Sequence, residues 1–236
     1  MKHPSADALT ARFGHLQAVL ARERLDALVL VHLPNVQYLT GFGGSAAILV
    51  VSGGGSRFIT DGRYTTEVLA SVIPNCPGLE LVGVDPSYDE TLARVLETHH
   101  RAARVGIEAS HMTVARHGWL TGRLGGTLEL VAVDRAVEQA RLVKDAFELD
   151  VFREAAAMLD DVVHDVFAVA RAGQREIELA AEIDYRIKRR GFSKTSFDTI
   201  VASGPNAALP HARPGERTLE AGDLVVLDFG GVHRGY

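Results

Sequence analysis

Two side chains towards the C-terminal end, Asp228 and His211, have the type and the setting that chemistry requires. Asp228 directly follows residues 224–227, a continuous apolar run that predicts a short strand buried on both faces. A carboxylate at the end of such a strand is costly unless it is hydrogen-bonded, paired or bound to a cation. His211 lies between Pro210 and Pro214, which restrict the loop and therefore the orientations of the imidazole. The two residues are thus candidates for a cation-binding carboxylate and for an imidazole presented to a ligand.

Spacing alone leaves simpler interpretations of both residues open. Asp228 could cap the turn that Gly230 and Gly231 allow, and His211 could be an exposed loop histidine. Asn206 is expected to shape its turn rather than to contact a ligand. The sequence contains no His-Glu-x-x-His zinc helix and no Gly-x-Ser-x-Gly elbow, so two common catalytic classes are not indicated.

The sequence around both candidates resembles the pita-bread metallopeptidases. The similarity is to their proline-specific branch, the Xaa-Pro aminopeptidases and the Xaa-Pro dipeptidases (prolidases). Two segments, SFDTIVASGPNAALPHARP at residues 196–214 and LEAGDLVVLDFGGVHRGY at residues 219–236, resemble the opening of that branch's catalytic domain. Several motifs in the same order carry far more information than one motif would.

The N-terminal half carries the second part of the resemblance. Residues 33–35, 38–42 and 60–64 resemble the creatinase-type N-terminal domain of the same branch. The resemblance implies an α/β fold class. A creatinase-like domain over residues 1–140, with a mixed sheet covered by helices, would precede the first part of a pita-bread (α+β) catalytic domain over residues 141–236.

The resemblance implies a hydrolase that cleaves the peptide bond before proline, with proline-containing peptides as substrates. The family holds two divalent metal ions, here expected to be manganese, cobalt or zinc, with two aspartates, a histidine and two glutamates. Asp228 matches the first aspartate, and His211 matches a family histidine that contacts substrate and assists proton transfer. The other ligands would follow Tyr236. Because one carboxylate cannot hold a metal pair, we expect this chain alone to bind no metal stably and to be inactive.

Two other functions stay open from the sequence. A creatinase-like hydrolase shares both domains and uses no metal, although the retention of Asp228 argues against it. A non-catalytic dimerisation or binding module is favoured for the chain as written, because most metal ligands are absent up to Tyr236. Analogy with the family implies a homodimer in either case.

Composition excludes several classes of partner. The net charge of −5 argues against nucleic acid or an anionic membrane as the main partner. Cys76 is the only cysteine, so the sequence holds neither a disulfide framework nor a cysteine metal cluster. No apolar run reaches membrane-spanning length, and residues 1–12 lack the apolar region of a signal peptide. We therefore expect a cytoplasmic protein without a membrane partner.

Apolar periodicity predicts alternating strands and helices over the first half of the chain. Strands are predicted at residues 27–31, 46–51, 57–60, 79–84, 104–108 and 128–133, and helices at residues 9–20, 63–72, 87–96 and 113–124. The glycines at residues 53–55 predict a hairpin, because no Gly-Lys-Ser/Thr of a phosphate loop follows. Two helices, at residues 145–172 and 175–190, are predicted to precede the C-terminal strands.

Three further expectations concern loops and isolated polar residues. Residues 35–44 are predicted to be a loop, and a sharper hypothesis has that loop reach the substrate cleft of a partner subunit. His99, His100 and His111 lack ligand spacing and are expected to be solvated. Asp61 is expected to cap a helix or to form an ion pair rather than to act as a catalytic acid.

Overall fold

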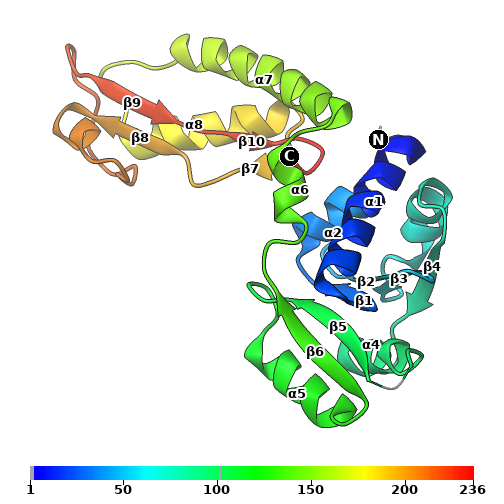
Figure 1. Ribbon diagram of the computed structural model, residues 1–236. Coiled ribbons are helices and arrows are strands. Elements are labelled where there is room, and N and C mark those ends of the chain that lie inside the picture. Colours follow the sequence, from blue (N-terminus) through cyan, green and yellow to red (C-terminus); the bar gives the residue numbers. More distant parts are fainter. Residues whose placement is uncertain (1–2, 101) are drawn as a thin grey trace. The chain divides into compact units, whose positions relative to one another are not determined.

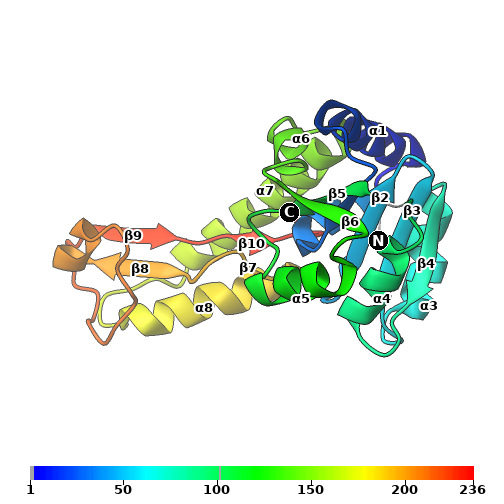
Figure 2. The same cartoon turned by 60° about the horizontal axis from the view of Figure 1, so that its bottom comes forward.

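The apolar runs of the first half of the chain form one mixed six-stranded sheet (Figure 2). The computed structural model describes residues 3–100 and 102–236. The spatial order of the strands is β4-β3-β2-β1-β5-β6, with β1 parallel to β5, β5 parallel to β6 and β3 parallel to β4. The strand bounds are β1 (Ala27–Leu30), β2 (Ile48–Ser52), β3 (Gly55–Thr60), β4 (Leu79–Gly83), β5 (Ala103–Glu108) and β6 (Leu128–Val133). The predicted mixed sheet is confirmed.

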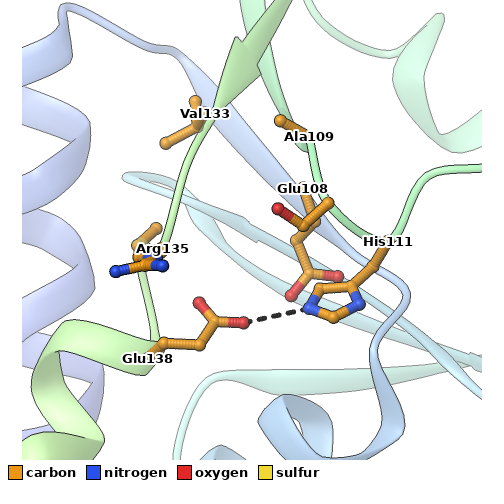
Figure 3. Close-up of a pocket in the computed structure, with 8 residues that line it drawn as sticks. Glu108, Ala109, His111, Val133, Arg135 and Glu138 are labelled. Carbon is orange, nitrogen blue, oxygen red and sulfur yellow. Dashed lines mark hydrogen bonds and ion pairs between the residues drawn. The ribbon is translucent and has the colours of Figure 1, made fainter.

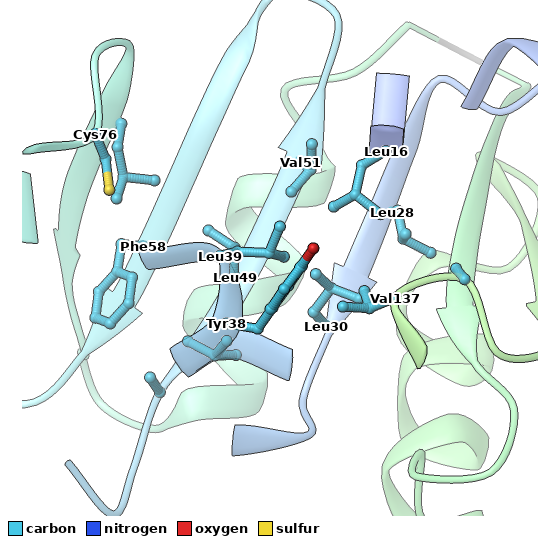
Figure 4. Close-up of a cluster of buried hydrophobic side chains, with 14 of the residues drawn as sticks. Leu16, Leu28, Leu30, Tyr38, Leu39, Leu49, Val51, Phe58, Cys76 and Val137 are labelled. Carbon is cyan, nitrogen blue, oxygen red and sulfur yellow. The ribbon is translucent and has the colours of Figure 1, made fainter. Parts of the chain in front are cut away.

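Helices cover both faces of the sheet, because the central strands carry apolar side chains on both faces. In β1, Leu28 and Leu30 pack with α1 (Ala6–Glu23) and α2 (Leu33–Thr40), as Figure 4 shows. Alternate residues of the same strand, Ala27 and Val29, pack with α4 (Tyr88–Leu96) and α5 (Val114–Leu124). All of β1 is buried, and each large aliphatic side chain contributes about 1.5–3 kcal/mol.

The predicted hairpin at the three glycines is confirmed. β2 and β3 pair antiparallel, and Ser52 lies opposite Gly55. Gly55 has a φ of 128°, a backbone conformation that residues other than glycine rarely adopt. The hydroxyl of Ser52 donates to the carbonyl of Gly55 across the turn at 2.7 Å.

The prediction of a loop over residues 35–44 is wrong for most of that range, because Leu33–Thr40 form the helix α2. Pro34 lies in the first turn, where its missing N–H costs nothing, and Gly41 ends the helix with a φ of 74°. Val36 and Leu39 are fully buried. Their burial against the sheet stabilises a helix too short to form alone.

The single helix predicted over residues 63–72 is also wrong in detail. A short helix, α3 (Thr65–Glu67), leads into a π-helical turn at Val68–Val72 and a 3₁₀ turn at Ile73–Asn75. Val68 and Val72 are both fully buried. Both side chains belong to one core, as their i, i+4 spacing allows, whereas the π-helical turn itself leaves no signal in sequence periodicity.

The chain divides into two compact units, Met1–Phe147 and Glu148–Tyr236 (Figure 1). The short helix α6 (Glu138–Leu142) belongs to the first unit. The domain boundary at residue 140 stays a prediction. Of the helices in residues 3–100 and 102–236, none is long and apolar enough to cross a membrane.

The second unit packs two helices against short antiparallel strand pairs. Its helices are α7 (Ala146–Phe167), whose first residues precede the unit, and α8 (Glu176–Arg189). Its strands are β7 (Lys194–Thr195), β8 (Ile200–Ser203), β9 (Val225–Asp228) and β10 (Gly231–Val232), and they pair as β8-β9 and β7-β10. The core contains Val162 and Val166 of α7, Leu179 and Ile183 of α8, and Val201 of β8.

The helix α7 ends five residues earlier than the predicted Ala172. Beyond Phe167 the chain turns, so that the Gly173 N–H donates to the carbonyl of Leu219 at 2.8 Å. The Leu219 N–H returns a bond to the carbonyl of Gln174 at 2.9 Å. The Gly173 N–H and the Gln174 carbonyl are therefore not available for the hydrogen bonds of a longer helix.

Candidate functional site

The candidate histidine, His211, is exposed in the loop that follows β8. Gly204–Ala208 form a 3₁₀ turn, and two backbone bonds continue it: Leu209 N–H to the carbonyl of Asn206 at 2.9 Å, and Ala212 N–H to the carbonyl of Leu209 at 3.2 Å. Sequence reasoning therefore located a genuine loop. Its bounding prolines limit the backbone dihedrals further.

The loop is attached to the start of α8 by a residue that sequence reasoning missed. Glu176, the first residue of α8, is fully buried and accepts hydrogen bonds from both ends of the loop. The Asn206 amide donates to both of its carboxylate oxygens, at 3.1 and 3.2 Å. Asn206 thus shapes the loop, as predicted. In the sequence, Glu176 is indistinguishable from any acidic residue in the first turn of a helix.

The ion pair of Arg217 and Asp223 stabilises the start of the same loop. The Arg217 guanidinium donates to the Ser203 hydroxyl and to an Asp223 carboxylate oxygen, each at 2.7 Å. Hydrogen bonds from Arg217 lower the pKa of Asp223, so the carboxylate stays charged. Gly204 is required beside this pair: its φ is 50°, and a Cβ there would lie 2.6 Å from the Arg217 guanidinium.

The candidate metal ligand, Asp228, is the last residue of β9 and lies opposite Ile200 of β8. The prediction that residues 224–227 are buried on both faces is wrong. Val225 and Leu227 pack towards α8, whereas Val226 is 42% exposed and Leu224 is 83% exposed. Asp228 points to the exposed side by the same alternation, so the argument from a buried charge does not apply to it.

The glycines after Asp228 serve close packing. Gly231 lies in β10, opposite Thr195 of β7, and a Cβ on it would lie 2.4 Å from the buried ring of Phe192. Among the described residues, no hydrogen bond reaches the Asp228 carboxylate, so the interpretation of Asp228 as a turn cap finds no support.

The structure does not bring His211 and Asp228 into contact. The loop of His211 leaves β8 at Ser203, which pairs with Val225, while Asp228 pairs at the other end of the strands with Ile200. Within residues 3–100 and 102–236, no group of three or more His, Cys, Asp or Glu side chains could hold a metal ion. The side chains present therefore do not fit a metal centre by themselves.

A second polar cluster lies in the first unit, where the parallel strands β1, β5 and β6 end (Figure 3). Glu108, the last residue of β5, is 6% exposed and accepts from the N–H groups of Val31 and His32 at 2.6 and 2.8 Å. Asn35 of α2 donates to Glu108 and to Glu138, each at 2.7 Å. Glu108 and Glu138 line a cavity of about 170 Å³.

The expectation that His111 is solvated is wrong. Its Nε2 lies 3.2 Å from a carboxylate oxygen of Glu138 (Figure 3). Its ring stacks on that of His32, with centroids 3.7 Å apart and planes 13° apart. The ring of His100 approaches Asp26 at 3.2 Å. These contacts join residues far apart in sequence, which spacing alone cannot reveal.

Partial burial of His32 makes the first unit sensitive to acid. Burial, and then the neighbouring His111, lower the pKa of His32, while Glu108 and Glu138 oppose this and Arg141 adds to it. A folded-state pKa below the unfolded value gives stability that is present above about pH 6.5 and lost as the pH falls further. We expect the melting temperature to fall between about pH 8 and about pH 5, and to fall less in His32→Gln. Equal slopes in thermal melts of the two proteins would contradict this.

Asp61 fulfils the expectation of an ion pair. Its carboxylate accepts from the Arg63 guanidinium at 2.9 Å on each oxygen, and from the Tyr88 hydroxyl at 2.7 Å. The bonds from Arg63, followed by that from Tyr88, hold the pKa of Asp61 well below its usual range. A carboxylate so committed is a poor proton donor, in agreement with a structural role.

Two family descriptions match the chain, one for each half. The Creatinase/Prolidase N-terminal domain matches residues 12–143, and Metallopeptidase family M24 matches residues 150–236. The first match alone covers more than half of the chain.

Known proteins resemble the chain over most of its length. An uncharacterized peptidase of Bacillus subtilis, YqhT, is 35% identical over 212 residues, which is 90% of this chain and 58% of the relative. An Xaa-Pro dipeptidase of Pyrococcus horikoshii is 26% identical over 234 residues, 98% of this chain and 62% of the relative. The solved Xaa-Pro dipeptidase from Bacillus anthracis has a TM-score of 0.88 at 27% identity, over 97% of this chain and 62% of that one.

The chain thus spans about three fifths of the length of these relatives, and its α/β fold agrees with the expected fold class. The order of the two matched domains is also the order in which the motifs occur. The resemblance to the pita-bread peptidases is confirmed: the chain belongs to the Creatinase/Prolidase N-terminal domain family, and residues 150–236 that follow this domain match Metallopeptidase family M24.

Proposed function

We propose that the protein is a metal-dependent hydrolase that cleaves the peptide bond before proline, as an Xaa-Pro dipeptidase (prolidase) or an Xaa-Pro aminopeptidase. The observation that carries this proposal is the match of both halves to the two family descriptions in the same order. The Xaa-Pro dipeptidases of Pyrococcus horikoshii and Bacillus anthracis support the substrate class. Proline-containing peptides are therefore the proposed substrates.

In this proposal, Asp228 contributes one carboxylate to a divalent metal centre, and His211 contacts the substrate. Two features support these roles. The Asp228 carboxylate is exposed at a strand end, and the His211 imidazole is exposed on a loop tied to α8. Carboxylate oxygens suit manganese, cobalt and zinc alike, so the residues present favour none of them. Because the described side chains do not complete a metal site, we propose that this chain alone is inactive.

A non-catalytic binding or dimerisation module remains the alternative. The lack of further metal ligands favours this alternative: in the part of the chain that the structure describes, Asp228 belongs to no group of metal-binding side chains. We propose a homodimer for either function, in the cytoplasm. The single free cysteine, Cys76, is buried, and burial raises its pKa to about 11, which suits a protein without redox chemistry.

The intact mass of the native protein is the first measurement. A mass well above 25.4 kDa would make the peptidase proposal testable on Ala-Pro and Ala-Pro-Ala, with each metal added after EDTA treatment. We expect hydrolysis only with metal, and loss of it in Asp228→Asn. Hydrolysis unaffected by EDTA would favour the creatinase-like alternative. No hydrolysis with any metal, or a native mass equal to that of this chain, would favour the binding module.

A further inference from the structure

The Glu176 carboxylate of the second unit accepts five hydrogen bonds, all from the segment 203–215 that contains His211. It is fully buried at the start of α8. One oxygen accepts from the Ser203 N–H at 2.7 Å, from the Ser203 hydroxyl at 2.8 Å and from Asn206 at 3.1 Å. The other accepts from Asn206 at 3.2 Å and from the Gly215 N–H at 3.2 Å. Its hydrogen-bonding capacity is therefore filled by one loop.

These donors come from the two ends of the segment that carries His211. Ser203 and Asn206 lie before His211, and Gly215 lies after it. A single buried carboxylate thus closes the loop at its base. The entropic cost of closing the loop is offset at its base, where Arg217 also contacts Ser203.

Between its ends, the loop has few other attachments. Between Asn206 and Gly215, its backbone hydrogen bonds are internal, from Leu209 to Asn206 and from Ala212 to Leu209; at the start of the loop, the Gly204 N–H donates to the carbonyl of Leu224 at 3.0 Å. Beyond it, the Ile177 N–H donates to the carbonyl of Gly215 at 3.1 Å, which again leads to the first turn of α8. The place of His211 relative to α8 therefore depends on the base of the loop.

The charge of Glu176 is what the arrangement needs. Burial raises its pKa, but the bonds from Ser203, Asn206 and Gly215 together outweigh burial and leave the pKa lowered. Arg217 donates to the Ser203 hydroxyl, and that hydroxyl donates to Glu176, so a cation and an anion polarise the same hydrogen bond. A neutral glutamine would turn an N–H₂ group towards donors that now face an acceptor.

We propose that Glu176 is a positioning residue that fixes the loop of His211. Its importance for catalysis rests on the proposed function of His211, whereas its effect on the loop does not. Loss of the carboxylate is expected to release the segment between Ser203 and Gly215 while the core of α7, α8 and β8 stays folded.

Hydrogen exchange of the 236-residue chain tests the effect on the loop. In Glu176→Gln, we expect amide exchange in residues 204–214 to be roughly tenfold faster, the factor that corresponds to one lost buried hydrogen bond. The matched control is Glu178→Gln, in the same helical turn. Its carboxylate contacts Arg175 and is 47% exposed. The control should leave the loop unchanged.

If Glu176→Gln does not fold, Asn206→Ala removes only one donor residue and should raise loop exchange by a smaller factor. Unchanged exchange in the loop of either folded variant would overturn the proposal. So would an equal rise throughout the unit, because it would mean that Glu176 stabilises the whole unit rather than the loop.

The catalytic consequence is tested in the native protein by a double-mutant cycle. If Glu176 acts through His211, Glu176→Gln should lower kcat but should cause no further loss when added to His211→Ala. Additive losses would overturn the positioning role. A wild-type protein without Xaa-Pro hydrolysis would instead count against the proposed function, and the exchange result would still decide whether Glu176 holds the loop.

Discussion

Glu108→Ala is expected to destabilise the unit Met1–Phe147 by about 3–5 kcal/mol, because three donors lose their acceptor at about 1–3 kcal/mol each and two of the three bonds are only partly buried. The donors are the N–H groups of Val31 and His32 and the amide of Asn35, at 2.6 to 2.8 Å. They belong to the end of β1 and to α2, which Glu108 ties to the end of β5. Urea unfolding of the purified chain measures the change.

The matched control for this prediction is Glu129→Ala. Glu129 lies on the neighbouring strand β6, and its side chain is 62% exposed in an ion pair with Arg104 at 3.2 Å. Removing an exposed ion pair should change stability by less than about 1 kcal/mol. A loss in Glu108→Ala as small as that of the control would mean that water replaces the carboxylate, and the structural role of Glu108 would be refuted.

Arg12→Ala is expected to cost about 3 kcal/mol, near the lower end of what breaking a buried ion pair costs. The Arg12 side chain is 3% exposed in α1, and its guanidinium contacts Asp145 at 2.7 Å. It also donates to the carbonyl of Tyr38 and lies 4.2 Å from the centre of that ring. One residue therefore joins α1, α2 and the start of α7, so its loss removes packing as well as charge.

Two comparisons make this second prediction specific. Arg22→Ala, in the same helix, removes a side chain that is 69% exposed and paired with Glu23, and should be nearly neutral. Arg12→Met keeps most of the buried volume and should recover part of the loss. If Arg12→Met unfolds at the same urea concentration as the wild type, packing alone explains the role of Arg12, and the ion pair with Asp145 contributes nothing.

Both predictions concern polar residues that hold the first unit together, and the same design recurs around Glu176 in the second. At Glu108 and Glu176, a buried carboxylate at the end of a strand or the start of a helix accepts from backbone and amide groups of a distant segment. Such carboxylates cost desolvation energy and are retained only where several donors meet them. They determine where loops lie.

The sequence by itself determined the family, the mixed α/β sheet and the hairpin at residues 53–55. Local signals are sufficient for these features. Apolar runs predict buried strands, and consecutive glycines, which adopt positive φ readily, predict tight turns. The loop of His211 was also evident, because its prolines and Asn206 mark it without reference to any other segment.

Only the tertiary structure decided which polar groups meet and which faces are covered. The helix α2 forms because Val36 and Leu39 find a core, although propensity alone suggested a loop. The strand β9 has one exposed face, because helix packing reaches only Val225 and Leu227. Glu108 and Glu176 gain their roles from partners 27 to 77 residues away, and a carboxylate in a sequence carries no mark of the donors that folding will bring to it.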